Sequence, residues 1–149
     1  MASRMQCPTA MNPKTIELQA RTQRFATAVI KFCQGLPQDA ATQKIASQLS
    51  DSSSSTDSNY RATCRARSPE EFISKIGVAA EEADESNGWL QLLVASNLVR
   101  IEDARDLIQE SYELTAIFVA SRKTAQRRKA ERERLQKQIS RPNRRRLSK

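Results

Sequence analysis

Histidine is absent from this chain of 149 residues, and glycine and proline are scarce, with 3 and 5 residues respectively. The lack of histidine removes the usual general base, the Ser–His and Cys–His nucleophile pairs, and most zinc and non-haem iron sites. The scarcity of turn residues argues against an all-β fold, which needs a turn about every ten residues, and favours a few long helices. The composition therefore predicts an all-α protein that is not an enzyme.

Cysteine is also sparse, and its three copies are dispersed along the chain at Cys7, Cys33 and Cys64. No two of them have the spacing of metal ligands, and no secretory signal or membrane span accompanies them. We therefore expect reduced thiols in a cytoplasmic protein with no metal or other cofactor. Cys33 is expected to be a small core residue.

Positive charge is in excess, with a net charge of +8, but it is distributed very unevenly. Residues 122–149 contain 13 Lys and Arg against 2 Glu, whereas residues 1–121 contain 12 basic and 15 acidic side chains. A basic arm on a mildly acidic body predicts an acidic partner, which is nucleic acid or, less often, an anionic membrane surface.

The first predicted helix covers residues 14–35, where apolar and small side chains recur at alternating steps of four and three residues. Gly35 and Pro37 predict its end, since glycine favours the C-terminal cap and proline bars continuation. Its inward face comprises Leu18, Thr22, Phe25, Val29, Phe32 and Leu36.

The second helix is predicted to begin after a capping Asp39, but the serine-rich run at residues 50–59 has two interpretations. Serine and aspartate compete with the helical backbone for hydrogen bonds, so the composition favours a linker. The alternative is a continuous helix in which Ser52 or Ser53, together with Thr56, packs at the seam with a neighbouring helix.

The third helix has a strong start at Ser68 and Pro69, with a serine cap, proline at the first position, and acidic side chains in the first turn. It is predicted to end near Ser96 and Asn97. A seven-residue repeat defines its inward face, which comprises Phe72, Ile76, Ala79, Ala83, Ser86, Leu90 and Leu93.

The last helix is predicted to begin near Glu102, and nothing breaks it before Ser140, although its apolar stripe fades after Ala125. Four long amphipathic helices with short loops predict an antiparallel up-down-up-down four-helix bundle. Trp89, Leu92 and Val119 are left over as apolar surface for self-association. The predicted organisation is a disordered lead at residues 1–13, the bundle at 14–125, and a basic helical extension with a disordered tail at 126–149.

Three arginines, Arg61, Arg65 and Arg67, precede the third helix, and the antiparallel order places them at the same end as the basic tail. Their position has two interpretations. Either the three arginines bind phosphate groups of a nucleic acid, or they pair with Glu70, Glu71 and their neighbours in an ion-pair network at the helix end. We favour the network for these three arginines.

For the tail we favour nucleic-acid binding, because 2 acidic side chains cannot neutralise 13 basic ones. Arg and Lys neutralise phosphates without reading bases, and the tail has no aromatic side chain for stacking, so little sequence specificity is expected. Either RNA or DNA fits this prediction. The candidate residues are Arg122, Lys123, Arg127, Arg128, Lys129, Arg132, Arg134 and Lys137.

A second charged cluster, Glu81, Glu82, Asp84 and Glu85, raises the question of a metal site. Di-iron bundles use Glu-x-x-His pairs on facing helices, and this chain has no histidine to complete them. The cluster is interpreted as a solvated or salt-bridged helix face.

The order of these elements, over about residues 14–125, resembles the four-helix-bundle family of the 23S rRNA intervening-sequence protein. The motifs that carry the resemblance are Asn59-Tyr60-Arg61 after a helix of small residues, then Arg65-Ala66-Arg67-Ser68, then Phe72 and Lys75, and then the Glu-Glu-Ala-Asp-Glu run at residues 81–85.

The resemblance implies a bundle that assembles into a ring, typically a homopentamer. A similar accessory protein of diversity-generating retroelements is a basic pentamer that binds nucleic acid and a reverse transcriptase. The resemblance also implies that the serine-rich run lies within the second helix. Because the body before residue 122 is acidic here, any nucleic-acid role is expected to rest on the tail. The alternative function is that of a scaffold for protein assembly.

Overall fold

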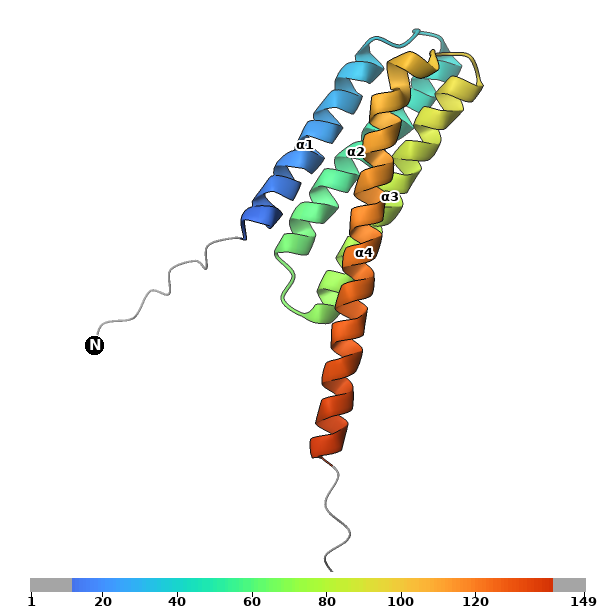
Figure 1. The fold of residues 1–149 in the computed structure, drawn as a ribbon. Coiled ribbons are helices and arrows are strands. Elements are labelled where there is room, and N and C mark those ends of the chain that lie inside the picture. The colour runs from blue at the N-terminus through green and yellow to red at the C-terminus, as the bar shows by residue number, and fades with distance from the viewer. Residues whose placement is uncertain (1–11, 141–149) are drawn as a thin grey trace, which may run out of the picture.

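The computed structural model describes residues 12–140, and these residues form four α-helices and no β-strand. Residues 1–11 of the predicted lead (residues 1–13) and residues 141–149 of the predicted tail lie outside the described residues, whereas Asn12 and Pro13 belong to the start of α1. Successive helices are joined at alternating ends by short connections (Figure 1). The predicted all-α four-helix bundle is confirmed. The helices are α1 (Pro13–Gln34), α2 (Ala40–Cys64), α3 (Pro69–Ala95) and α4 (Ile101–Ile139).

Side-chain caps define the start of three helices. The backbone N–H of Lys14 donates to the side chain of Asn12, so α1 begins at Pro13, one residue before the predicted start. Asp39 and Ser68 accept the same kind of bond at the starts of α2 and α3, as their sequences predicted. Asn97 has a positive φ of 54° and lies just after α3, in the turn to α4.

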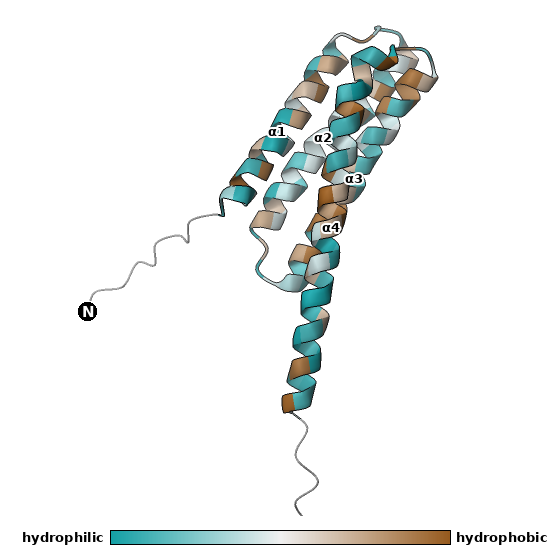
Figure 2. Cartoon of the chain, viewed as in Figure 1, coloured by the Kyte–Doolittle hydropathy of each residue, from teal (hydrophilic) through white to brown (hydrophobic). Residues whose placement is uncertain are grey.

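The core consists of aliphatic and aromatic side chains from all four helices. The predicted inward faces are confirmed, except that a few members near their ends, such as Leu18, Phe32 and Phe72, are only partly buried. Tyr60 of α2 stacks on Phe118 of α4 with a ring-centroid distance of 5.3 Å, which joins the two diagonal helices. In Figure 2 each helix carries both hydrophobic and hydrophilic residues, and hydrophilic residues predominate on the lower part of α4.

The serine-rich run is helical and lies inside α2, so its interpretation as a linker was wrong and the one implied by the resemblance is confirmed. Ser52 and Ser53 are buried, as is Thr56. Each of these hydroxyls donates to a carbonyl three or four residues earlier, so burying it leaves no polar atom without a partner. The hydroxyl oxygen of Ser52 can also accept from Ser86 of α3, with 2.8 Å between the two oxygens, because two small side chains let α2 and α3 approach closely.

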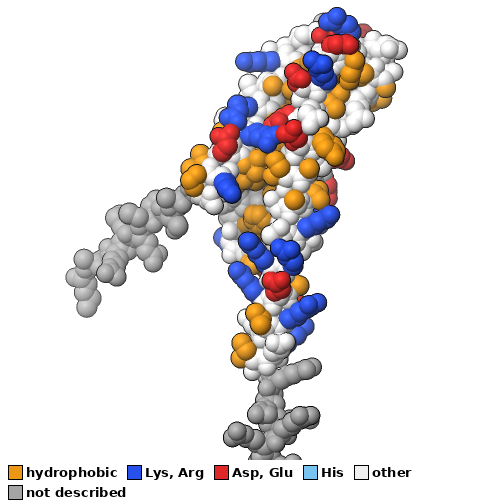
Figure 3. Space-filling view, in the orientation of Figure 1, with side chains coloured by type: hydrophobic (Ala, Val, Ile, Leu, Met, Phe, Trp, Pro, Cys, Tyr) orange, Lys and Arg blue, Asp and Glu red, His pale blue; other side chains and the backbone are white. Residues whose placement is uncertain are grey.

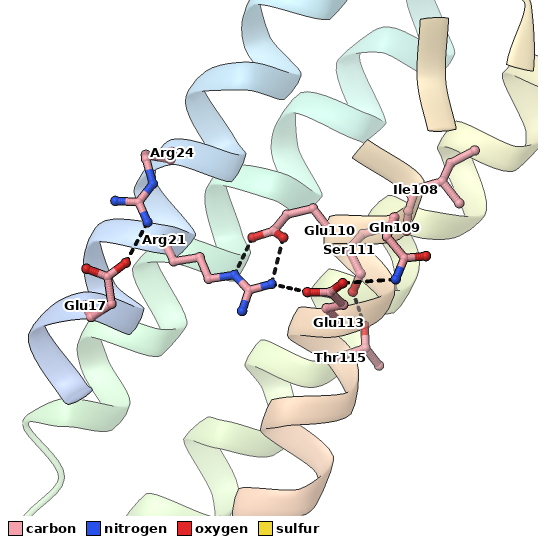
Figure 4. Close-up of polar contacts among 9 residues, drawn as sticks. All are labelled: Glu17, Arg21, Arg24, Ile108, Gln109, Glu110, Ser111, Glu113 and Thr115. Atoms are coloured by element: carbon pink, nitrogen blue, oxygen red, sulfur yellow. Dashed lines mark hydrogen bonds and ion pairs between the residues drawn. The ribbon is translucent and has the colours of Figure 1, made fainter. Parts of the chain in front are cut away.

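Helix α1 packs mainly on α2, and a group of charged residues fastens it to α4. The Arg21 guanidinium donates from Nε to Glu110 at 2.6 Å and also binds Glu113, which the side chain of Gln109 holds in place (Figure 4). These contacts raise the pKa of Arg21, the hydrogen bond to Glu110 being the largest cause. Because Arg21 and Glu110 are both about three-quarters buried, this pair is better shielded from salt than a surface ion pair.

Two further expectations concern the thiols and the membrane. Cys33 is buried in the core as predicted, and burial raises the pKa of its thiol. Cys64 is half-buried and free, whereas Cys7 lies outside the described residues. Within residues 12–140, none of the helices combines the length and the hydropathy that a membrane span requires.

Candidate nucleic-acid interface

Helix α4 is longer than the other three and continues past the end of the bundle, as the ribbon in Figure 1 shows. We call residues 126–139 the α4 extension. From residue 130 onward every side chain of this helix is exposed. The sequence predicted this solvated helical continuation, and all eight candidate cations of residues 122–137 lie on α4.

Two of these cations are held by the bundle. Lys129 pairs with Glu70 in the first turn of α3 at 3.0 Å, and more weakly with Glu133 at 3.7 Å. The ion pair lowers the pKa of Glu70 and raises that of Lys129. Arg122 packs across Gly77 of α3 so closely that a Cβ on this glycine would lie 3.2 Å from the guanidinium carbon. The base of the extension is thus attached to α3 at two points.

The remaining cations have no acidic partner within ion-pair distance in the described part of the chain. All of them are exposed, and Figure 3 shows Lys and Arg side chains clustered along the lower part of α4 with few acidic ones between them. We call this set the free cations: Lys123, Arg127, Arg128, Arg132, Arg134 and Lys137.

The three arginines before α3 behave differently from one another. Arg67 pairs with Glu71, with 3.6 Å between Nε and Oε2, as the predicted network requires. Arg61 instead pairs within its own helix with Asp57 at 3.0 Å, a partner that the prediction did not include. Arg65 is exposed and has no acidic partner among the described residues.

Glu71 is the centre of this helix-end network. Its carboxylate accepts the backbone N–H of Arg67 at 2.8 Å and binds Lys75 at 3.0 Å. These bonds stabilise the charged form and lower the pKa of Glu71 to about 2, the bond from Arg67 being the largest cause.

We expect the free energy of unfolding to fall as the pH drops from about 4.5 to about 2. The folded pKa of Glu71 is depressed, so its contribution is complete above the ordinary glutamate value and is lost as the carboxylate takes up a proton. Urea unfolding at several pH values measures this fall, which should be shallower in Glu71→Gln. Parallel curves for the two proteins would contradict the assignment.

A cavity of about 750 Å³ opens at the same end of the bundle. Residues from all four helices line it, among them Lys14 of α1, Cys64 of α2, Phe72 of α3, and Thr124 and Arg128 of α4. The start of the folded part, the turn between α2 and α3, and the beginning of the basic segment therefore meet at one end, as the antiparallel order predicted.

Among residues 12–140, no Lys or Arg forms an ion pair with the acidic face of α3. Burial, together with the neighbouring charges of Glu85 and Glu81, raises the pKa of Glu82. Over residues 12–140, His, Cys, Asp and Glu form no group of three or more that could hold a metal ion. Glu85 instead accepts the indole N–H of the half-buried Trp89 at 3.0 Å.

The bundle part of the chain matches a known protein family. The family model described as 23S rRNA-intervening sequence protein matches residues 14–120. The chain belongs to this family. No match was found among curated proteins.

A solved structure with the same fold supports the family assignment. It is a protein of unknown function from the S23 ribosomal protein family of Bacteroides thetaiotaomicron VPI-5482, and it has 25% sequence identity to this chain and a TM-score of 0.66. The similarity covers 98% of that protein but 74% of this chain. The match to the 23S rRNA-intervening sequence protein family ends at residue 120, so the free cations lie outside it.

Proposed function

We propose that this family member is a non-enzymatic, homo-oligomeric protein that binds nucleic acid through the phosphate backbone. The observation that supports this most is the set of six free cations on a solvent-exposed helix. Unpaired Lys and Arg bind polyanions because binding releases condensed counterions, and this gain does not depend on the base sequence.

The proposal includes assembly into a ring, as a homopentamer. Support comes from large apolar side chains that the monomer leaves exposed, including Leu92 at 42%, Tyr112 at 66% and Val119 at 37% exposure. Exposed apolar surface of this kind is common where subunits meet. A ring would place several copies of the α4 extension on one particle, and multiple arms on one polyanion raise the overall affinity.

The test is a titration of a labelled nucleic acid at several salt concentrations. For the full chain we expect the logarithm of the binding constant to fall with the logarithm of salt concentration, since six phosphates are neutralised by one arm, with a slope of about −4 on a single strand and about −5.5 on duplex DNA. A chain that ends at Ala125, and a full-length variant with all six free cations replaced by glutamine, should both bind at least about a hundredfold more weakly at 0.15 M salt.

The glutamine variant is needed because it keeps the helix while removing the charge. Native mass spectrometry of the wild type and of this variant checks the subunit number independently of binding. If the protein assembles but binds no nucleic acid, it acts instead as a scaffold for protein assembly. If it binds equally well without the six cations, the free cations are not its binding site and the proposal is wrong in that respect.

A further inference from the structure

The α4 extension has the shape of a rod. Helix α4 runs without a break from Ile101 to Ile139, and its exposed part from residue 130 to residue 139 is about 15 Å long. Its diameter with side chains is about 10–12 Å. The contacts of Lys129 with Glu70 and of Arg122 with Gly77 fix the base of this rod on α3. The free cations are therefore presented at set positions around a rigid cylinder.

These cations form two rows on opposite sides of the rod. An α-helix turns about 100° per residue, so Arg128 and Arg132 continue the line of the core-facing Leu114 and Phe118. We call this pair the inner row. Three others, Arg127, Arg134 and Lys137, lie roughly half a turn away around the helix axis and form the outer row, and Lys123 lies on the same side just before the extension.

We infer that the α4 extension binds in the major groove of double-stranded DNA in the B form, with one row of cations against the phosphates of each strand. This inference rests on the nucleic-acid binding proposed above and names the class of nucleic acid. The major groove of B-form DNA is about 12 Å wide and admits an α-helix, and its two walls both carry phosphates. A helix with cations on two opposite sides can therefore place one row of positive charge against the phosphates of each wall of the groove.

Other nucleic acids fit this arrangement less well. The major groove of an A-form RNA duplex is deep and narrow, so a helix of this diameter does not enter it. A single strand offers one row of phosphates, and proteins that bind single strands add aromatic side chains on which bases stack. Residues 126–139 contain no Phe, Tyr or Trp.

The test compares the two rows on three probes of the same sequence: a DNA duplex of 16 base pairs, the corresponding RNA duplex, and single-stranded DNA. One variant removes the inner row (Arg128→Gln with Arg132→Gln), and the other removes two members of the outer row (Arg127→Gln with Arg134→Gln). Fluorescence anisotropy should show the tightest wild-type binding for the DNA duplex. Each variant should weaken that binding by roughly tenfold or more and reduce the magnitude of its salt slope by about 2.

A matched control removes two positive charges at the other end of the bundle, with Lys31→Gln and Arg105→Gln, and should leave duplex binding within about twofold of the wild type. A second variant, Ala130→Pro, keeps every charge but interrupts the exposed helix. It should lose the preference for the DNA duplex, with circular dichroism and native mass used to confirm that the bundle is intact.

The outcomes separate the two proposals. If binding is equal for the three probes, strongest for the RNA duplex, or sensitive to one row alone, the major-groove inference is wrong and the proposed nucleic-acid function stands. The same conclusion follows if Ala130→Pro binds the DNA duplex as the wild type does. If no probe binds at all, both proposals are wrong.

Discussion

Replacing Phe118 by alanine is expected to destabilise the bundle by about 3–5 kcal/mol, the usual range for emptying a large aromatic site in a core. Phe118 is fully buried at 0% exposure and stacks on Tyr60. The substitution removes the apolar area and this aromatic pair, and it leaves a cavity between α2 and α4 that the surrounding helices fill only in part. Urea unfolding followed by circular dichroism measures the change.

The neighbouring Val119 provides a matched control, because it lies on the same helix but is 37% exposed. Val119→Ala removes less apolar contact and improves helix propensity, so its effect should stay within about 0.5 kcal/mol. Similar losses for the two variants would mean that α4 is rotated relative to the packing described above.

Replacing Ser86 by leucine is expected to cost about 1–3 kcal/mol through overpacking. Ser86 is fully buried between α2 and α3, and its hydroxyl oxygen lies 2.8 Å from that of Ser52 and 2.9 Å from the carbonyl oxygen of Glu82, so its one proton is donated to one or the other. Leucine has no room there unless the two helices move apart. Thermal unfolding should show a lower midpoint with the same helical content at low temperature.

Two variants separate steric crowding from the loss of hydrogen bonds. Ser86→Ala removes the hydroxyl without adding volume, and Ser52 still donates to the carbonyl of Leu49 at 3.2 Å, so a cost of about 1 kcal/mol is expected. Ser54→Leu adds the same bulk at an exposed position of α2 and should not destabilise. A cost for Ser86→Ala as large as that for Ser86→Leu would argue against crowding.

Much of the fold could be predicted because its signals are local. The cap residues Asp39 and Ser68 lie directly before the helices that they start, and the steps of three and four residues identify the sides of α1 and α3 that face the core. Such patterns depend on residues within one or two turns of each other, so a single sequence contains them complete.

The serine-rich run could not be assigned from composition, because what decides its structure is tertiary packing. In isolation its hydroxyls favour non-helical conformations. In the bundle, Ser52, Ser53 and Thr56 are the small side chains that fit against a neighbouring helix, and burial of Leu49 and Tyr60 on either side of them favours the helix. The packing energy outweighs the weak propensity.

The candidate interface was predicted only in outline for a similar reason. The count of charges showed that most cations of the tail lack partners, but it could not show which ones. Lys129 pairs with Glu70 because α3 and α4 lie side by side at this end of the bundle. Arg122 packs against Gly77 because that residue has no side chain to obstruct it. Contacts between residues about 45 to 60 positions apart depend on the rotation of both helices, which periodicity does not give.

The unbroken course of α4 means that the tip of the extension moves whenever the orientation of α4 in the bundle changes. About 31 Å of helix separates Phe118 from Ile139, at a rise of about 1.5 Å per residue. A tilt of about 10° of α4, together with the α3 turns that hold its Arg122 and Lys129, would therefore move the tip by about 5 Å, nearly half the width of a DNA major groove. Small changes in how α4 packs, whether from a substitution or from contact with another subunit, would thus be amplified into large changes in where its cations can reach.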